Sequence, residues 1–360
     1  MKPLYRNLFL LFGIVAIVVM LCTFDVDFAQ LRSRLAQAGM YLPAVVGIWV
    51  VVYAFNARAF QLIVNSGQHD MHLSFRHSYK LTVSGFAFSY TTPFGSGGLP
   101  YRVMELGNFI GLVRATSSVV LYSMMHVLSH FCLWFSSLLL FAIYYTEKMT
   151  PFLWGFFVVF AAVFLLVISA FNVGYKRGFI AYLFNPLLHI PFVKKPARRF
   201  YDNHRHDLQQ VDANIAYLRS RPRAFWCSLL WEYVARVTNS FEYYFILLSL
   251  GVSLSFWDAV LVLAFSSLVG NLLFFLPMQL GAREGGLSLI VKILGLSNPG
   301  IGVFTSLYTR VRELFWIFVG VSLVKIGNKR LMRGPLPPQS QQGQEPAERT
   351  RQVETQHERL

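Results

Sequence analysis

Two segments of this chain combine a proline, a cluster of glycines, an arginine and a glutamate. The first is PFGSGGLPYRVMEL at 93–106, and the second is PMQLGAREGGL at 277–287. Each segment interrupts an apolar stretch, one in each half of the chain. Non-helical backbone at membrane depth survives only where protein buries it or where it lines a wet cavity. A matched pair of Gly/Pro-broken apolar segments therefore points to the binding site of a transporter.

The residue types in these two breaks suit an anion. Glycine lets the backbone approach a ligand closely, and a helix that begins after each break presents free N–H groups at its N-terminus. Arg102 and Arg283 add charge-assisted donors that suit phosphate. The candidate binding residues of the two breaks are Gly95, Gly97, Gly98, Arg102, Glu105, Gly281, Arg283 and Glu284. The alternative is that both breaks are plain turns between short helices.

Two apolar stretches, 224–250 and 301–324, also carry ionisable residues, which are costly inside a membrane and usually functional. Four of these residues join the candidate site: Glu232, Arg236, Arg310 and Glu313. Arg236 would lie roughly 18 Å from the start of its helix, near the bilayer midplane. The alternative is structural, with ion pairs at i,i+4 and i,i+3 spacing inside each helix.

Metal and redox chemistry are not expected. His126 and His130 lie one helical turn apart but lack a third ligand, so hydrogen bonding in the core explains them better. The three cysteines, Cys22, Cys132 and Cys227, all fall inside apolar runs without metal-ligand spacing. No cofactor is predicted.

The composition places the chain among polytopic helical membrane proteins. Of its 360 residues, 55% are hydrophobic and only 14% are charged, whereas a soluble domain carries about 25% charged residues. Several apolar runs approach the ~20 residues that a spanning helix needs. They are 7–24, 41–57, 117–145, 151–174, 224–250, 258–276 and 301–324. We therefore expect an all-α bundle in which 7–24 is a retained helix and not a cleaved signal.

The formal net charge of +15 is concentrated at the predicted membrane ends. Ten Lys and Arg residues lie in 175–223, and others flank the first and last helices. The positive-inside rule then places both termini and the 175–223 loop in the cytoplasm. We expect the membrane to be the inner membrane of a prokaryote. Basic ends also favour anionic membrane lipids as partners. A nucleic-acid partner is not expected, because the charge follows the membrane ends and not one folded face.

The two broken segments predict two units of opposite orientation. Residues 81–116 are interpreted as a re-entrant hairpin that follows a cytoplasmic loop at 59–80, and 258–297 as a hairpin entered from outside. With their flanking helices they form an inverted-topology repeat, about 41–145 and about 224–326. Two short full spans in place of each hairpin are the alternative.

These units belong to one membrane domain, 1–333, which is followed by a polar tail, 334–360, that we expect to be disordered. Between the units, 196–223 places apolar residues at helical spacing: Leu208, Val211, Ile215 and Leu218. This pattern predicts an amphipathic cytoplasmic helix that lies on the membrane or against the bundle.

The chain also resembles a known family. PFGSGGLPYRVMEL, the LGAREGG of the second break and LYTRVREL at 307–314 resemble the transmembrane domain of lysylphosphatidylglycerol synthase/flippase proteins. The resemblance covers roughly residues 5–330. It implies a domain linked to moving a phospholipid or a polyprenol-linked headgroup between leaflets. Some members carry a soluble aminoacyl-transferase domain after it, where this chain has its polar tail, so lipid aminoacylation is not expected here.

The leading hypothesis is a flippase-like transporter, without catalytic residues, that binds an anionic lipid headgroup. A first alternative is an accessory subunit that anchors a separately encoded synthase or transferase through the basic 175–223 loop. A second is a lipid-linked glycosyl or acyl transferase, for which the sequence offers neither a DxD pair in a loop nor a Ser/His/Asp set. Homo-oligomerisation is compatible with all three.

Overall fold

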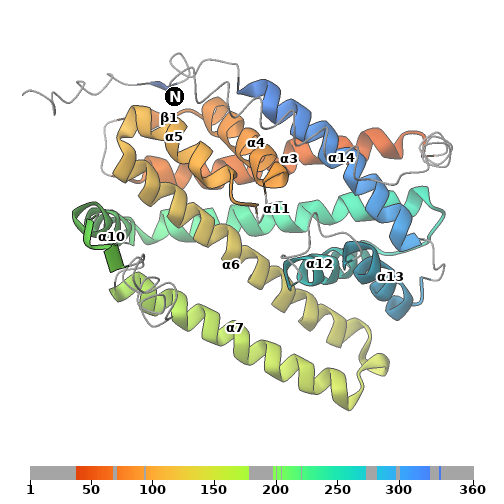
Figure 1. The fold of residues 1–360 in the computed structure, drawn as a ribbon. Helices are drawn as coiled ribbons and strands as arrows, with labels where there is room; N and C mark the ends of the chain where they lie inside the picture. Colours follow the sequence, from red (N-terminus) through yellow and green to blue (C-terminus); the bar gives the residue numbers. More distant parts are fainter. Residues whose placement is uncertain are drawn as a thin grey trace, which may run out of the picture.

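The computed structural model is a bundle of α-helices (Figure 1). It describes residues 38–67, 71–92, 95–177, 198–199, 201–203, 205–219, 221–272, 282–296, 301–324 and 332–333. The longer helices are α3 (Tyr41–Asn65), α6 (Leu112–Tyr144), α7 (Pro151–Arg177), α11 (Pro222–Ser249) and α14 (Ile301–Leu323). The shorter ones are α4 (Phe75–Thr91), α5 (Gly98–Ile110), α10 (Arg205–Arg219), α12 (Phe256–Leu272), α13 (Ala282–Leu294) and the 3-10 turn η2 (Thr146–Lys148). A short antiparallel ladder joins β1 (His72–Leu73) to β2 (Met332–Arg333). The predicted helix 7–24 and the tail 334–360 lie outside the described residues.

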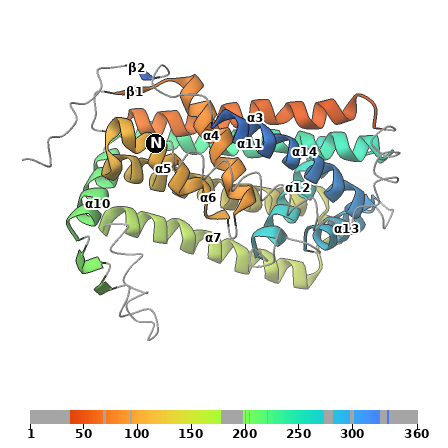
Figure 2. The same cartoon turned by 45° about the horizontal axis from the view of Figure 1, so that its top comes forward.

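Within the described ranges, three helices are long and apolar enough to cross a membrane: α3, α6 and the Pro151–Ser169 part of α7. The helices α11 and α14 are also long, at 28 and 23 residues, but carry ionisable side chains along their length. α11 packs against α3, α6, α12 and α14, and α14 also packs against α4 and α13. Figures 1 and 2 both show α3 and α11 running side by side. The predicted all-α polytopic class is confirmed.

Two pairs of short helices flank the two breaks. The second helix of each pair, α5 or α13, has 13 residues. That length gives roughly 20 Å of helix, too short for the roughly 30 Å hydrocarbon core of a bilayer. α4 contacts α5, and α12 contacts α13. Because Figure 1 places the pairs towards opposite ends of the long helices, the arrangement favours two hairpins entered from opposite sides. The inverted repeat and its bounds stay a prediction.

The cytoplasmic loop predicted at 59–80 is largely helical, so that prediction was wrong. α3 continues to Asn65, and α4 begins at Phe75. Beyond Arg58, the side chains of Phe60, Ile63 and Val64 are buried at helical spacing. Arg58 thus adds a charge to the helix but does not interrupt the helical spacing of the apolar residues that pack against the bundle.

Glycines let α4 approach both α5 and α14 closely. A β-carbon at Gly98 would overlap the carbonyl oxygen of Gly85, and one at Gly320 would lie 2.5 Å from the β-carbon of Ala87. The hydroxyl of Ser84 donates to the carbonyl of Gly320 at 2.8 Å. α4 therefore packs closely between α5 and α14. This packing sets the position of Arg102 on α5.

The amphipathic helix between the units packs against the bundle. It is α10, whose Val211 and Ile215 are buried. α10 contacts α6, α7 and α11. Of the two placements that the sequence left open, the structure has the one against protein.

Candidate functional site

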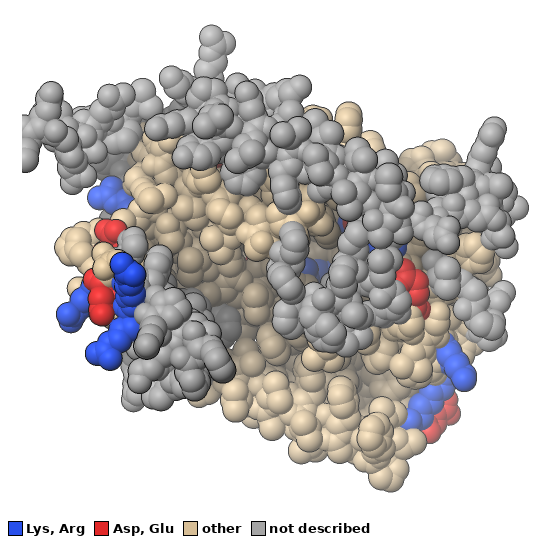
Figure 3. All heavy atoms as spheres, in the orientation of Figure 1, with Lys and Arg blue, Asp and Glu red and all other residues tan. Residues whose placement is uncertain are grey.

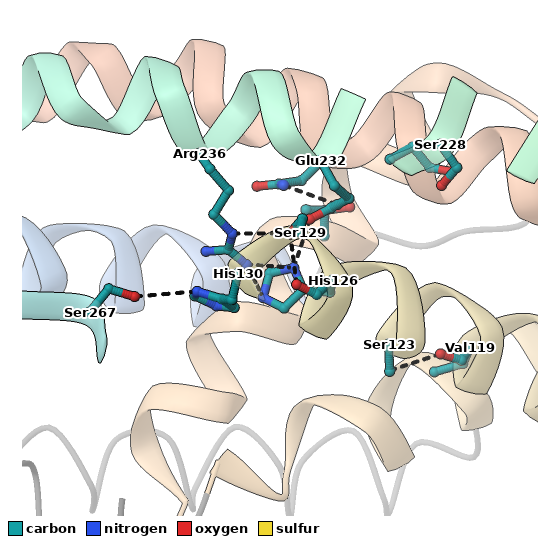
Figure 4. Close-up of polar contacts among 12 residues, drawn as sticks. Val119, Ser123, His126, Ser129, His130, Ser228, Glu232, Arg236 and Ser267 are labelled. Carbon is teal, nitrogen blue, oxygen red and sulfur yellow. Dashed lines mark hydrogen bonds and ion pairs between the residues drawn. The ribbon is translucent and has the colours of Figure 1, made fainter. Parts of the chain in front are cut away.

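A group of polar side chains lies where α3, α6 and α11 meet (Figure 4). We call it the central cluster, and its members are Asn56, His126, Ser129, Glu232 and Arg236. His126 Nδ1 lies 2.8 Å from Glu232 Oε2, and Asn56 Nδ2 donates to Glu232 Oε1 at 3.0 Å. Arg236 Nη2 lies 2.8 Å from His126 Nε2, and Arg236 Nε donates to Ser129 Oγ at 3.2 Å. Glu232 and Arg236 thus meet through the imidazole of His126.

These partners define the protonation state of His126. The Glu232 carboxylate can only accept hydrogen bonds, so the Nδ1 atom that faces it must donate. The ring proton then lies on Nδ1, from which it is donated to the Glu232 carboxylate. Arg236 Nη2 lies 3.1 Å from Nδ1 as well as 2.8 Å from Nε2, so the guanidinium contacts the side of the ring between the two nitrogens. A second proton on the ring would meet this positive charge, which disfavours it. This assignment follows from the hydrogen-bond network, and it leaves the imidazole neutral.

Arg102 of α5 lies beside the central cluster among aromatic rings. Its guanidinium carbon is 4.9 to 6.0 Å from three ring centres, those of Phe86, Tyr122 and Phe60. Its hydrogen bonds to the backbone carbonyls of α4 are long, at 3.5 Å. The residue is only 6% exposed. Gly85 makes room for it, because a β-carbon there would overlap Nε of Arg102.

Arg102 and the central cluster together carry a surplus positive charge. Two guanidiniums, Arg102 and Arg236, face one carboxylate, Glu232, and the intervening His126 is neutral. Both guanidiniums are within electrostatic reach of Glu232. In the part of the chain that the structure describes, neither has a carboxylate within ion-pair distance. A buried charge without a partner is costly, so one anion bound here would be stabilising.

Three other arginines are each paired with a carboxylate from a different helix. We call these residues the paired group. The pairs are Arg283 Nη1 with Glu313 Oε1 at 2.7 Å, Arg310 Nη2 with Glu284 Oε1 at 2.7 Å and Arg312 Nε with Glu242 Oε1 at 2.8 Å. Trp49 Nε1 also donates to Glu242 Oε2 at 2.8 Å. The charges of the paired group cancel, so it has no surplus to offer a ligand.

The pairs that the sequence suggested within each helix are not the ones that form. Glu232 contacts His126 and not Arg236, and Arg310 and Glu313 each bind a residue of α13. An i,i+4 or i,i+3 spacing only places two side chains on one helix face. Here the neighbouring helices bring opposite charges to that face, and those partners take the hydrogen bonds.

The two arginines predicted to bind phosphate together lie in different surroundings. Arg102 adjoins the central cluster, whereas Arg283 belongs to the paired group, where Glu313 neutralises it. Glu105 is buried one turn after Arg102 on α5.

The glycines of the first break serve its turn and its packing. Gly95 has φ 68°, a left-handed conformation that suits glycine. Gly97 donates its backbone N–H to Thr92 Oγ1 at 2.7 Å, so that group is already satisfied. Gly98 begins α5, and Gly281 of the second break lies outside the described residues.

Sequence reasoning missed several members of these groups. Asn56 is a single amide inside an apolar run, and Ser129 lies one turn after His126. The sequence did contain an indication of both Asn56 and Ser129, since a polar side chain inside a spanning helix needs a hydrogen-bond partner. Arg312 and Glu242 were visible as intramembrane charges, but nothing in the sequence indicated that they pair across 70 residues.

Part of the central cluster remains accessible to solvent. The His126 side chain is 23% exposed although it lies between helices, and Arg236 is half-buried. Figure 3 shows a hollow on the face that it draws, with a Lys or Arg side chain visible inside it. The exposed part of the His126 side chain lets a ligand contact the cluster without a helix unfolding.

The described residues contain no group of three or more His, Cys, Asp or Glu side chains that could hold a metal ion. His130, one turn from His126, instead contacts Ser267 Oγ through Nδ1 at 3.3 Å. The two imidazole rings are 5.5 Å apart, edge to face.

Comparison with known proteins gives one match. A family model described as "Lysylphosphatidylglycerol synthase TM region" matches residues 9–320. Within that region lie both hairpins, the central cluster and the paired group. No curated protein and no solved structure matches the chain.

Proposed function

This chain belongs to the lysylphosphatidylglycerol synthase transmembrane-region family, and from that premise we propose that it is a transporter for an anionic lipid headgroup. Family membership and the spanning helices give a membrane protein with a lipid-related function. The proposal adds that the headgroup of a phospholipid or of a polyprenol-linked lipid moves between leaflets. It involves no chemical step and no cofactor.

The observation that carries this proposal is the surplus charge beside the central cluster. Arg102 and Arg236 present two guanidiniums to one carboxylate, in a region that solvent partly reaches. Guanidinium binds phosphate through a fork of donors, which suits a phosphodiester. An anionic headgroup bound between Arg102 and Arg236 would supply the countercharge that these guanidiniums lack. This binding would favour entry of the headgroup into the bundle.

The paired group then has a different role in the proposal. Its arginines are already neutralised by Glu242, Glu284 and Glu313. We assign these pairs to holding α11, α13 and α14 together, while Arg102 and Arg236 hold the phosphate. The hairpin arginine Arg283 would contact the headgroup only if Glu313 released it.

The proposal is tested by reconstituting the protein into vesicles that contain a fluorescent phosphatidylglycerol. A membrane-impermeant reductant bleaches only the outer leaflet, so bleaching beyond that share reports transfer from the inner leaflet. We expect the wild-type protein to give that extra bleaching and Arg236→Gln to lose it. Arg223→Gln is the matched control, since it removes the same charge from an exposed position on the same helix.

A thermal-unfolding measurement accompanies the transport assay. Arg236 has no carboxylate partner among the described residues, so Arg236→Gln should fold with unchanged or higher stability. Vesicles with wild-type protein that bleach no further than protein-free vesicles would contradict the transporter proposal. Full transport by a folded Arg236→Gln protein would contradict the role given to this residue.

A further inference from the structure

The guanidinium of Arg236 lies in contact with the imidazole ring of His126, with Nη2 close to both ring nitrogens. Nε2 lies 2.8 Å from Arg236 Nη2, while Nδ1 faces Glu232 at 2.8 Å. A proton added to the neutral ring must bind at Nε2, because Nδ1 already carries one. That proton would place an imidazolium against the guanidinium, so a proton at Nε2 and the observed position of Arg236 disfavour each other.

Protonation would change the charges around the ring. The imidazolium would keep Glu232 as its partner through Nδ1, in a hydrogen bond that now joins two opposite charges. It would repel the guanidinium of Arg236, because two like charges in contact disfavour each other. Arg236 would leave the ring and become free to bind an anion.

The reverse order leads to the same state. An anion that draws Arg236 away removes a positive charge from beside the ring, and its negative charge favours a proton at Nε2. Linkage requires the proton and the anion to strengthen each other's binding by the same factor. The arrangement in the structure, with Arg236 against the ring, corresponds to the state that has bound neither the proton nor the anion.

From this geometry we infer that His126 is a proton-binding site coupled to the anion site, so that one proton is carried with each anionic headgroup. The inference rests on the proposed function, because the anion is the headgroup. It deepens that function by naming the proton as the co-transported ion. A proton gradient across the membrane could then drive the lipid in one direction.

The surroundings of His126 allow this role. The side chain is 23% exposed, so water can reach it. The titratable or charged groups around it come from three helices and are Glu232 and Arg236 of α11, Arg102 of α5, and His130 and Tyr122 of α6. α3 contributes the neutral Asn56 through Glu232, and α4 contributes the ring of Phe86 at 5.3 Å. Glu232 is the carboxylate in this set, and it faces the Nδ1 side.

The test is calorimetric titration of the purified full-length protein with dihexanoyl-phosphatidylglycerol. The phosphodiester of this soluble lipid stays anionic between about pH 6 and pH 8, where histidine titrates. Titrations in two buffers with different ionisation enthalpies give the number of protons taken up per bound lipid. We expect uptake approaching one proton, and an affinity that rises by up to about tenfold for each unit of acidification.

Two variants assign the proton. His126→Gln should abolish both the uptake and the pH dependence, whereas His130→Gln should retain them. Lipid binding without proton uptake in the wild-type protein would overturn the coupling and leave the transporter proposal intact. Absence of binding at every pH would overturn both. Retained uptake in His126→Gln would overturn the assignment, and if that variant does not fold, the wild-type titration still decides whether coupling exists.

Discussion

Arg312 and Arg236 are both surrounded by helices, yet their environments lead to opposite expectations. Arg312 is 2% exposed, binds the fully buried Glu242 and lies 3.9 Å from the ring centre of Trp49. Arg236 is partly exposed and reaches only a neutral imidazole and a hydroxyl. The first arginine is bound to its countercharge and serves the fold. The second, Arg236, has no carboxylate in ion-pair contact among the described residues, so an anionic ligand can supply its countercharge.

Glu242→Gln should therefore destabilise the protein strongly. Removing one partner of a buried ion pair costs about 3–5 kcal/mol, and here it leaves Arg312 with only the longer 3.7 Å contact to Glu313 Oε1. Adding Arg312→Met to Glu242→Gln removes the stranded charge, so the double variant should recover most of the loss. Denaturant unfolding of the wild type, the two single variants and the double variant would measure this as a coupling energy. Additive losses, with no recovery, would show that the pair is not what holds these helices.

At the scale of elements, the first hairpin depends on how closely α4 and α5 approach. Gly85 is the position where Arg102 crosses α4, and Gly85→Ala would place a methyl group on its guanidinium. We expect a loss of about 1–3 kcal/mol from this overpacking, together with loss of lipid transport because Arg102 is displaced. Thermal unfolding and the vesicle assay on the same preparation would check both effects.

Gly47→Ala is the matched control for this substitution. Gly47 lies within α3, and a β-carbon there would meet nothing within 4 Å. Alanine is a better helix former than glycine by about 1 kcal/mol, so this variant should be neutral or slightly more stable. Equal behaviour of the two variants would mean that Gly85 does not set the position of Arg102.

The sequence could predict most of the helices, but not which side chains pair between them. Apolar runs of spanning length predicted the helices well, and the glycines and prolines predicted the break between α4 and α5. The end of α3 was misplaced because Arg58 was given more weight than the apolar period around it. The partners of Glu232 and Arg310 could not be predicted, since they come from helices distant in sequence. Local spacing describes one helix face, and only packing decides which other helix covers it.

At the scale of the whole molecule, the two ends of the bundle are built differently. At one end, Tyr145 donates to Asp258 Oδ1 at 2.6 Å and Lys148 Nζ to the carbonyl of Ile293 at 3.1 Å, so the η2 turn is tied to the second hairpin. At the other end lies α10, beside the start of α11 (Figure 1). Among the described basic residues, Arg205 and Arg219 of α10 and Arg221 and Arg223 at the start of α11 lie at this end, so we expect it to face the cytoplasm.

Cysteine labelling of intact cells tests this orientation directly. The background would carry Ser at Cys22, Cys132 and Cys227, and single cysteines would replace the exposed residues Glu147 of η2 and Arg205 of α10. Because η2 and α10 lie at opposite ends of the bundle, an impermeant maleimide should label Glu147→Cys from outside and Arg205→Cys only after the membrane is opened. Labelling of Arg205→Cys in intact cells would show that the molecule has the opposite orientation in the membrane. The first hairpin would then enter from outside, and a proton gradient acting through His126 would drive the headgroup in the opposite direction.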